Sequence, residues 1–277
     1  MIQHHFDPIA LQLGPLAIRW YGLMYLVGIC IAWFLGNHRI KHQKHYNLTI
    51  NQEQFTDLII YMVMGLLVGG RLGYMVFYQT GAFLSKPWEI FLLWQGGMSF
   101  HGGLIGAILG LIYFSYKQKQ DFFALADFIA PLAPPAFFFG RVGNFINAEL
   151  WGKVTTMPWG VVFPGAGPLP RHPSQLYEGL LEGIVLFIIL WVFTQKQRPK
   201  MATSGLFFIC YGLFRIGVEF YRIPDSQLGY LAFEWLTMGQ ILSLPMVLLG
   251  VILLFFAYSK NYKIKYCNKF NTSCNNT

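Results

Sequence analysis

The sequence predicts an all-α polytopic membrane protein with about seven transmembrane helices, and three observations carry that prediction. Of the 277 residues, 55% are hydrophobic and only 12% are charged, which is far too apolar for an ordinary soluble domain. The mean hydropathy is +0.45. Apolar stretches of about 20 residues, the length that crosses the hydrocarbon core of a bilayer, recur along the chain.

The expected spans divide the chain into a transmembrane domain, residues 1–258, and a cytoplasmic tail, residues 259–277. No Lys or Arg precedes Arg19, so the charged front of a cleavable signal peptide is missing and the first span should remain as an anchor. The spans are expected near residues 17–36, 55–77, 97–115, 122–146, 178–194, 203–220 and 238–258.

Basic residues set the expected orientation. Twelve of the twenty Lys and Arg residues fall in the segments 37–54, 116–121, 195–202 and the tail. Because short cytoplasmic loops collect positive charge, the N-terminus is expected on the outer side and the C-terminus in the cytoplasm. In a bacterium the outer side of the inner membrane is the periplasm. The net charge of +8 is largely this bias, so no nucleic-acid partner is expected, whereas contact with anionic membrane lipids is.

Three features lie between or within the spans. The outer loop 147–177 holds five prolines and is expected to form a small periplasmic cap. The segment 83–95 is too short to span and carries Trp88 and Trp94, which predicts an amphipathic arm in the outer interface. Glycines recur at every fourth residue of the second and third spans, a spacing that lets helix backbones pack closely: Gly65, Gly69, Gly73, Gly102, Gly106 and Gly110.

Polar residues gather where the fourth span leaves the bilayer. The segment 140–152 places Arg141, Asn144, Asn147 and Glu149 there. Such groups are costly at that depth without a polar ligand, so a binding site is expected.

The basic residues also differ in type between the two sides. Ten of the twelve cytoplasmic cations are Lys, whereas six of the other eight are Arg. A planar guanidinium binds phosphate bidentately and sheds water more readily than an ammonium, so phosphate recognition is the first chemical expectation. The alternative is structural ion pairing with the outer acidic residues, which are Glu149, Glu178, Glu182, Glu219 and Asp225.

The sixth span carries a polar stripe. Helical spacing of i, i+4, i+8 and i+11 puts Tyr211, Arg215, Glu219 and Arg222 on one face. A charge at the bilayer centre costs about 2.5–3.5 kcal/mol, so three on one stripe imply a hydrated cavity or mutual pairing. Pairing of Glu219 with one arginine accounts for the negative charge, but it leaves the second arginine of the stripe without a counter-charge. This excess positive charge favours a ligand site at Arg215.

Histidines and cysteines narrow the chemistry further. His101 begins the third span at its outer end, where an imidazole serves as a general base near neutral pH or as a hydrogen-bonded structural residue. No second His stands near it at metal-ligand spacing, so no metal is expected. All four cysteines fall in spans or in the tail, which leaves the outer side without a thiol nucleophile.

Four segments carry a specific resemblance: W-Y-G-L-M-Y at 20–25, H-G-G-L-I-G at 101–106, G-R-V-G-N-F-I-N-A-E at 140–149 and R-H-P-S-Q-L-Y-E at 171–178. Through them the chain resembles the bacterial phosphatidylglycerol–prolipoprotein diacylglyceryl transferases. The likeness continues through 212–225 and 238–243, and it ends at about Ser259. In that family G-R-x-G-N-F-I-N is most often followed by Gly and Glu, whereas here Ala148 takes the Gly position.

The resemblance implies transfer of a diacylglyceryl group from phosphatidylglycerol to the lipobox cysteine in a prolipoprotein signal peptide. A thioether forms and glycerol phosphate leaves, which is the first step of bacterial lipoprotein maturation. The nucleophile then belongs to the substrate, in agreement with the missing outer thiol, and no cofactor is implied. Stabilising the growing negative charge on the leaving phosphate becomes the main catalytic task.

The resemblance also assigns site residues. Arg141 and Arg215 become the essential pair for the headgroup phosphate. Tyr21 and His101 match the family's functional Tyr and His, and one of them, with His101 preferred, would take the thiol proton directly or through water.

Six further positions are implied in substrate binding. Asn144 is expected to hydrogen-bond the glycerol or the phosphate, and Glu149 to orient an arginine. The substrate-binding set consists of Arg141, Asn144, Glu149, Gly152, Tyr211, Glu219 and Arg222.

Other classes of protein remain as alternatives. A lipid or solute transporter, such as a flippase, also carries charged helix faces, but it predicts repeat symmetry that the sequence does not display. A metal-dependent lipid phosphatase needs clustered Asp or paired His, whereas the five Asp are scattered. An intramembrane protease would use His101 with Ser99 or Ser243, which spacing alone allows.

Overall fold

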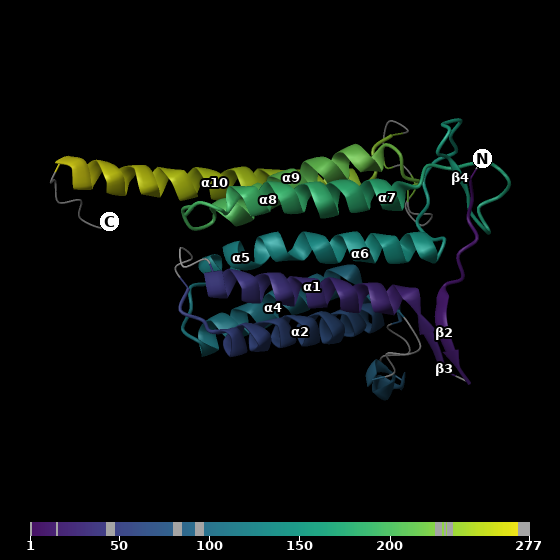
Figure 1. The fold of residues 1–277 in the computed structure, drawn as a ribbon, viewed down its shortest axis with the longest axis horizontal. Helices are drawn as coiled ribbons and strands as arrows, with labels where there is room; N and C mark the ends of the chain where they lie inside the picture. The colour runs from purple at the N-terminus through teal and green to yellow at the C-terminus, as the bar shows by residue number, and fades with distance from the viewer. Residues whose placement is uncertain are drawn as a thin grey trace. The chain divides into compact units, whose positions relative to one another are not determined.

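The computed structural model describes residues 2–14, 16–42, 48–79, 85–91, 97–224, 229, 231 and 235–270. Most of these residues are helical (Figure 1). The chain divides into two compact units, of which unit 1 comprises Met1–Leu35 with Asp127–Thr277 and unit 2 comprises Gly36–Ala126. Each unit is described by itself below.

Unit 1 holds most of the long helices. Within it α9 and α10 run side by side, and α6 packs against the helix that continues from α7 through η4 into α8 (Figure 1). Gly183 in η4 allows that second contact, because a Cβ there would lie 2.6 Å from Phe138 Cβ. The helices that belong wholly or partly to unit 1 are α1 (Trp20–His42), α5 (Phe122–Ile129), η3 (Ala130–Leu132), α6 (Ala133–Ile146), α7 (Ser174–Glu178), η4 (Gly179–Val185), α8 (Leu186–Phe193), α9 (Ala202–Glu219) and α10 (Met238–Phe270).

The N-terminal segment contains strands that the sequence analysis did not predict. β2 (Ile9–Leu13) and β3 (Leu16–Arg19) pair antiparallel and lead directly into α1. β1 (Ile2–Gln3) pairs in parallel with β4 (Val161–Val162), so the N-terminus is bound to the loop between α6 and α7. All four strands lie at one end of unit 1, whereas α10 finishes at the other (Figure 1).

The predicted cap, residues 147–177, is an ordered structure rather than an open loop, and its last four residues belong to α7. Its backbone folds on itself, because Val161 N donates to Arg171 O at 2.9 Å and Thr155 N donates to Pro170 O at 2.9 Å. Phe163 is 1% exposed at its centre. Phe163 packs against Trp151 of the same segment and against Phe145 and His4 outside it, so the segment is joined to α6 and to the N-terminus.

Unit 2 is built on two antiparallel helices, α2 (Gln52–Tyr78) and α4 (Phe100–Lys117), with the short helix η1 (Pro87–Phe91). Asn51 begins α2 with a capping box, in which its side chain and that of Gln54 each accept a hydrogen bond from the other's backbone N–H. Ser99 caps α4 by accepting from Gly102 N. Of the predicted arm 83–95, only 85–91 is described; it contains η1 with exposed Trp88, and Trp94 lies outside the described residues.

The glycine pattern of the second and third spans is confirmed as a packing device. A Cβ on Gly106 would overlap the backbone oxygen of Gly65, and it would lie 3.1 Å from Gly69 Cα. We expect Gly106→Ala to force α2 and α4 apart and to lower the free energy of unfolding by about 1–3 kcal/mol. Thermal unfolding in detergent measures this loss. Gly217→Ala is the matched control, because a Cβ at that helical glycine meets nothing within 4 Å; an equal loss in both variants would contradict the packing argument.

Each predicted span overlaps a helix or a run of consecutive helices. Among the described residues, five helices are long and apolar enough to cross a membrane: Trp20–His42, Gln52–Phe77, Phe122–Ile146, Ser174–Phe193 and Met238–Ser259. The predicted spans 97–115 and 203–220 form α4 and α9, which fall outside that set, so the count of seven stays a prediction. The predicted tail is helical as far as Phe270, because α10 continues past the end of its apolar part.

Candidate functional site

Three arginines of unit 1 meet at one buried carboxylate, that of Glu178. Arg141 Nη2 and Arg215 Nη1 lie 2.6 and 2.9 Å from its Oε2. Arg222 Nη1 donates to its Oε1 at 2.9 Å. The Glu178 side chain is 0% exposed, and both of its carboxylate oxygens contact guanidinium groups. The guanidinium groups are in turn fixed in place before any ligand binds.

Two more buried glutamates complete the cluster. Glu219 Oε2 lies 3.0 Å from Arg215 Nη2 and 3.9 Å from Arg222 Nε. Glu182 is 1% exposed and stands farther off, 4.0 Å from Arg141 Nη2 and 3.9 Å from Arg215 Nη1. Its Oε1 has no hydrogen-bond partner within the described part of the chain. Three Arg and three Glu thus form one compact array, which we call the ion cluster.

The local structure explains how distant parts of the sequence reach the ion cluster. Arg141 lies on α6 and Arg215 and Glu219 share a face of α9 at i, i+4 spacing. Glu178 ends α7, and the wider turns of the π-helix η4 begin at the next residue and carry Glu182. Insertions of this kind are common at functional sites.

The predicted polar stripe on the sixth span needs two corrections. α9 ends at Glu219, so Arg222 is not on the helix but in the turn after it, where it forms an isolated β-bridge with Gly152. The positive charge that the stripe left over is balanced by Glu178, which comes from another helix and which spacing along α9 does not reveal.

The signature residues after Arg141 extend the ion cluster by a chain of hydrogen bonds. Arg141 Nη1 donates to Asn144 Oδ1 at 3.4 Å, and Asn144 Nδ2 donates to Glu149 Oε1 at 2.7 Å. Gln175 Nε2 fixes the same turn by donating to Glu149 O at 2.5 Å. Glu149 therefore reaches the arginine through Asn144 rather than directly.

Gly152 lies where the cap meets the turn that carries Arg222. Its N–H donates to His172 O at 2.9 Å. A Cβ at this position would lie 2.5 Å from Tyr221 O and 2.8 Å from His172 O, both of them backbone atoms. The observed role of Gly152 is therefore close packing of the backbone beside Arg222.

The turn after α6 holds Ala148 in a backbone conformation that favours glycine, with φ at +53°. An L-residue pays about 1–2 kcal/mol in the left-handed region, which glycine avoids. We expect Ala148→Gly to raise the free energy of unfolding by about 1 kcal/mol, as measured by thermal unfolding. Its transfer activity should be unchanged. Ala133→Gly, at a φ of −74°, should do the opposite. A loss of stability at Ala148 would show that its methyl group is needed.

The tyrosines of the predicted site lie in unit 1 as well. Tyr21 OH is 3.1 Å from Tyr25 OH on the first turns of α1, and a Cβ on Gly143 of α6 would lie 3.1 Å from Tyr21 Cδ2. Tyr21 is therefore beside the residue that precedes Asn144. Tyr211 stacks on Phe207 one turn before Arg215, with ring centroids 5.8 Å apart.

His101 belongs to unit 2. It lies in the first turn of α4, is exposed, and its ring makes an edge contact with Phe100. The structure thus gathers all other predicted site residues in unit 1 and places the preferred base in the other unit. No group of three or more His, Cys, Asp or Glu suited to a metal ion occurs within the described ranges.

Sequence reasoning underrated Glu178 and Glu182, which it named only as possible partners in structural ion pairs. A signal was present for Glu178, because it is the last residue of the segment R-H-P-S-Q-L-Y-E. Glu182 follows four residues later and so shares its helix face.

The comparisons with known proteins identify the family of the chain. The family model described as prolipoprotein diacylglyceryl transferase matches residues 8–256. Proteins named phosphatidylglycerol–prolipoprotein diacylglyceryl transferase are 54% identical over 255 residues in Pseudomonas aeruginosa, covering 92% of this chain and 95% of that protein, and 55% identical over 254 residues in Coxiella burnetii, covering 92% and 96%. The chain therefore belongs to the prolipoprotein diacylglyceryl transferase family.

Proposed function

We propose that this protein transfers the diacylglyceryl group of phosphatidylglycerol to the lipobox cysteine thiol of prolipoproteins. The cysteine sulfur bonds to the glycerol carbon, the bond from that carbon to the phosphate oxygen breaks, and glycerol phosphate leaves. The observation that carries the proposal is the ion cluster, in which three guanidinium groups are fixed on Glu178. The two substrates, phosphatidylglycerol and a prolipoprotein, are those in the names of the relatives.

The phosphate is assigned to Arg141 and Arg215 because these two retain solvent access. Their side chains are 22% and 16% exposed, against 8% for Arg222. A guanidinium directed at the phosphate oxygens stabilises the charge that develops as the carbon–oxygen bond breaks. Because Glu178 already orients both side chains, little reorganisation is needed during the reaction.

The other signature residues support that phosphate site. Asn144 lies between Arg141 and Glu149, so its amide is held with its carbonyl toward the arginine. This arrangement favours a role in placing the arginine and in binding the glycerol or phosphate. Glu219 contacts both Arg215 and Arg222, which favours a role in orienting these arginines. Tyr211 stacks on Phe207 one turn before Arg215, which favours a role in shaping the phosphate site.

The thiol proton needs an acceptor, since the thiolate is the reactive form. We assign this role to His101, with Tyr21 as the second candidate. His101 has an exposed imidazole at the first turn of α4, and imidazole is the side chain that most often serves as a general base. Tyr21 lies beside Gly143 on α6 and so is close to the phosphate-binding arginines.

The proposed setting is the bacterial inner membrane. Residues 1–258 form the catalytic transmembrane domain with seven spans, residues 147–177 its periplasmic cap, and 259–277 a cytoplasmic tail. The N-terminus is then periplasmic, on the side where lipobox signal peptides emerge. Supporting this, β1–β4 lie at one end of unit 1 and α10 finishes at the other (Figure 1).

A reconstituted assay tests the proposal. Purified protein is given phosphatidylglycerol with a labelled diacylglyceryl group and a lipobox peptide, and labelled peptide is measured. We expect transfer by wild type and by Arg19→Ala, an exposed arginine of β3, and no transfer by Arg141→Ala or to a Cys→Ser peptide. If well-folded wild-type protein transfers no label to the peptide but moves labelled lipid across vesicle membranes, the transferase proposal is wrong and the transporter alternative is favoured.

A further inference from the structure

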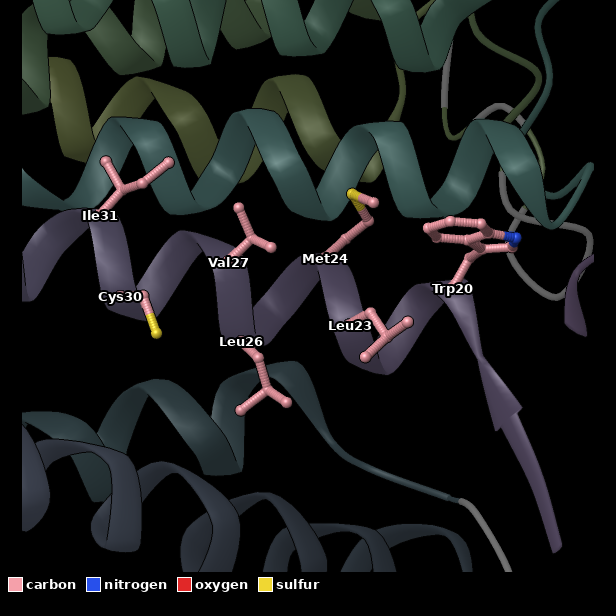
Figure 2. A pocket seen from close by; sticks show the side chains of 7 residues that line it. All are labelled: Trp20, Leu23, Met24, Leu26, Val27, Cys30 and Ile31. Atoms are coloured by element: carbon pink, nitrogen blue, oxygen red, sulfur yellow. The ribbon is translucent and has the colours of Figure 1, made fainter. Parts of the chain in front are cut away.

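The phosphate site does not account for the two hydroxyl groups of the phosphatidylglycerol headgroup. Hydroxyl groups that leave water need hydrogen-bond partners. A shallow hollow along α1 suits them poorly, because the seven side chains that line it carry no charge (Figure 2). These side chains are Trp20, Leu23, Met24, Leu26, Val27, Cys30 and Ile31. The ion cluster, by contrast, offers both donors and acceptors beside the phosphate-binding arginines.

Glu182 in the ion cluster stands too far from its arginines for a hydrogen bond. Arg141 Nη2 and Arg215 Nη1 lie 2.6 and 2.9 Å from Glu178 Oε2, but the same two nitrogens lie 4.0 and 3.9 Å from Glu182 Oε2 and Oε1. The Glu182 side chain is 1% exposed, and its Oε1 has no hydrogen-bond partner among the described residues. A buried acceptor in this state favours a ligand that donates to it.

The two gaps beside Glu182 have the width that one bridging oxygen spans. A hydroxyl oxygen that accepts from a guanidinium at about 2.9 Å and donates to a carboxylate at about 2.6 Å holds its two partners about 3.9–4.5 Å apart, for angles of about 90–110° at the oxygen. The gaps of 3.9 and 4.0 Å lie within that range. Each terminal guanidinium nitrogen carries two N–H groups, so one can stay on Glu178 while the other meets a hydroxyl.

The chemistry of the gaps favours a diol over other headgroups. Each gap has a donor on one side and an acceptor on the other, and a hydroxyl group both accepts and donates. An ammonium group only donates, and in contact with Glu182 its charge would be repelled by both neighbouring guanidinium groups. A plain alkyl group would leave the Glu182 carboxyl without a partner. The two gaps adjoin the two oxygens of one carboxyl group, which matches two hydroxyls on adjacent carbons.

We propose that Glu182, together with Arg141 and Arg215, binds the two adjacent hydroxyl groups of the phosphatidylglycerol headgroup and so selects lipids that carry a diol beyond the phosphate. The proposal rests on the function proposed above. Arg141 Nη2 and Arg215 Nη1 donate to the two hydroxyl oxygens, and the hydroxyl hydrogens are donated to Glu182. The arginine side chains are 22% and 16% exposed, so the headgroup reaches Glu182 by passing between them and solvent.

A lipid without the hydroxyls tests the proposal. Transfer is measured with dioleoyl phosphatidylglycerol and with dioleoyl phosphatidylpropanol, whose headgroup is an unbranched propyl chain. Wild type should prefer the diol at least about 100-fold in kcat/KM, because a site built to bond a hydroxyl discriminates strongly against an analogue without it. Glu182→Met removes both acceptors, so the preference should fall below about tenfold. Glu182→Gln has the same charge as that variant but keeps one acceptor, so its preference should be intermediate.

Glu219→Gln is the matched control. Glu219 is also buried, at 5% exposed, but it lies 3.0 Å from Arg215 Nη2, a direct contact into which no hydroxyl fits. Its substitution should lower transfer from both lipids and leave their ratio unchanged. An unchanged ratio in Glu182→Met, including an equal loss with both lipids, would overturn the diol assignment. Wild-type protein that transfers nothing from phosphatidylglycerol would instead overturn the proposed function.

Binding of the headgroup alone gives a second test that needs no transfer. Glycerol phosphate and propyl phosphate differ only in the two hydroxyls, and their affinities for the detergent-solubilised protein are measured by calorimetry. Wild type should bind glycerol phosphate at least about tenfold more tightly, whereas Glu182→Met should bind the two alike. Equal affinities in wild type would mean that the phosphate alone is recognised, and the inference would be wrong whatever the protein transfers.

Discussion

Replacing Glu178 with alanine is expected to be the most damaging single change in the ion cluster. The Glu178 carboxylate is 0% exposed and receives Arg141, Arg215 and Arg222 at 2.6 to 2.9 Å. Its removal leaves three cations in a poorly hydrated site with Glu219 and Glu182 as the nearest counter-charges. Loss of one partner from a buried ion pair costs about 3–5 kcal/mol, so we expect a drop of that size in the free energy of unfolding and loss of transfer.

Glu182 supplies the control for that prediction. It is buried to the same degree, at 1% exposed, but its ion-pair distances are 3.9 and 4.0 Å. If contact geometry sets the cost, Glu182→Ala should destabilise the protein much less than Glu178→Ala in thermal unfolding measured in detergent. Equal losses would mean that burial of the carboxylate, rather than its contacts, sets the cost. The loss of unfolding free energy in Glu178→Gln should lie between those of Glu178→Ala and Glu182→Ala, because the amide keeps the shape of the side chain and accepts one hydrogen bond.

The helices of this protein could be predicted because the bilayer constrains them strongly. An apolar run of about 20 residues has few alternatives to a helix in lipid, and the predicted span at 122–146 ends at the residue where α6 ends. The strands β1 to β4 fall outside the five helices that are long and apolar enough to cross a membrane, so that constraint does not apply to them. The turn signal at Gly14 between two β-branched and aliphatic runs was nevertheless available, and it marks the β2–β3 hairpin.

The ion cluster could be predicted only in part, for a related reason. Spacing along one helix identifies partners on that helix, and the Arg215–Glu219 pair at 3.0 Å follows from it. Glu178 lies 37 residues before Arg215 and meets it only after α7 and α9 pack. The same packing brings Arg222, which lies beyond the end of α9, into contact with Glu178. Contacts of this range depend on the fold and not on a local pattern.

Replacing Arg215 with lysine is the second change expected to have a large effect, and it acts on catalysis. Arg215 bridges two carboxylates with opposite ends of its fork, Nη1 to Glu178 at 2.9 Å and Nη2 to Glu219 at 3.0 Å. Lysine keeps the charge but cannot span both acceptors while also facing the phosphate, since an ammonium is a single point of charge. We expect kcat for transfer to fall about 100- to 1,000-fold, the loss seen when one preorganised donor is removed from a transition-state site.

Arg222→Lys separates that catalytic loss from general damage to the ion cluster. Arg222 is 8% exposed and contacts Glu178 through Nη1 at 2.9 Å, and an ammonium can replace that contact. We therefore expect Arg222→Lys to lower kcat less than about tenfold, although it makes the same change of residue type beside the same carboxylate. If the two variants lost kcat equally, exposure would not identify the phosphate-binding arginines. The assignment would then extend to all three guanidinium groups on Glu178, with the phosphate displacing them from that carboxylate as it binds.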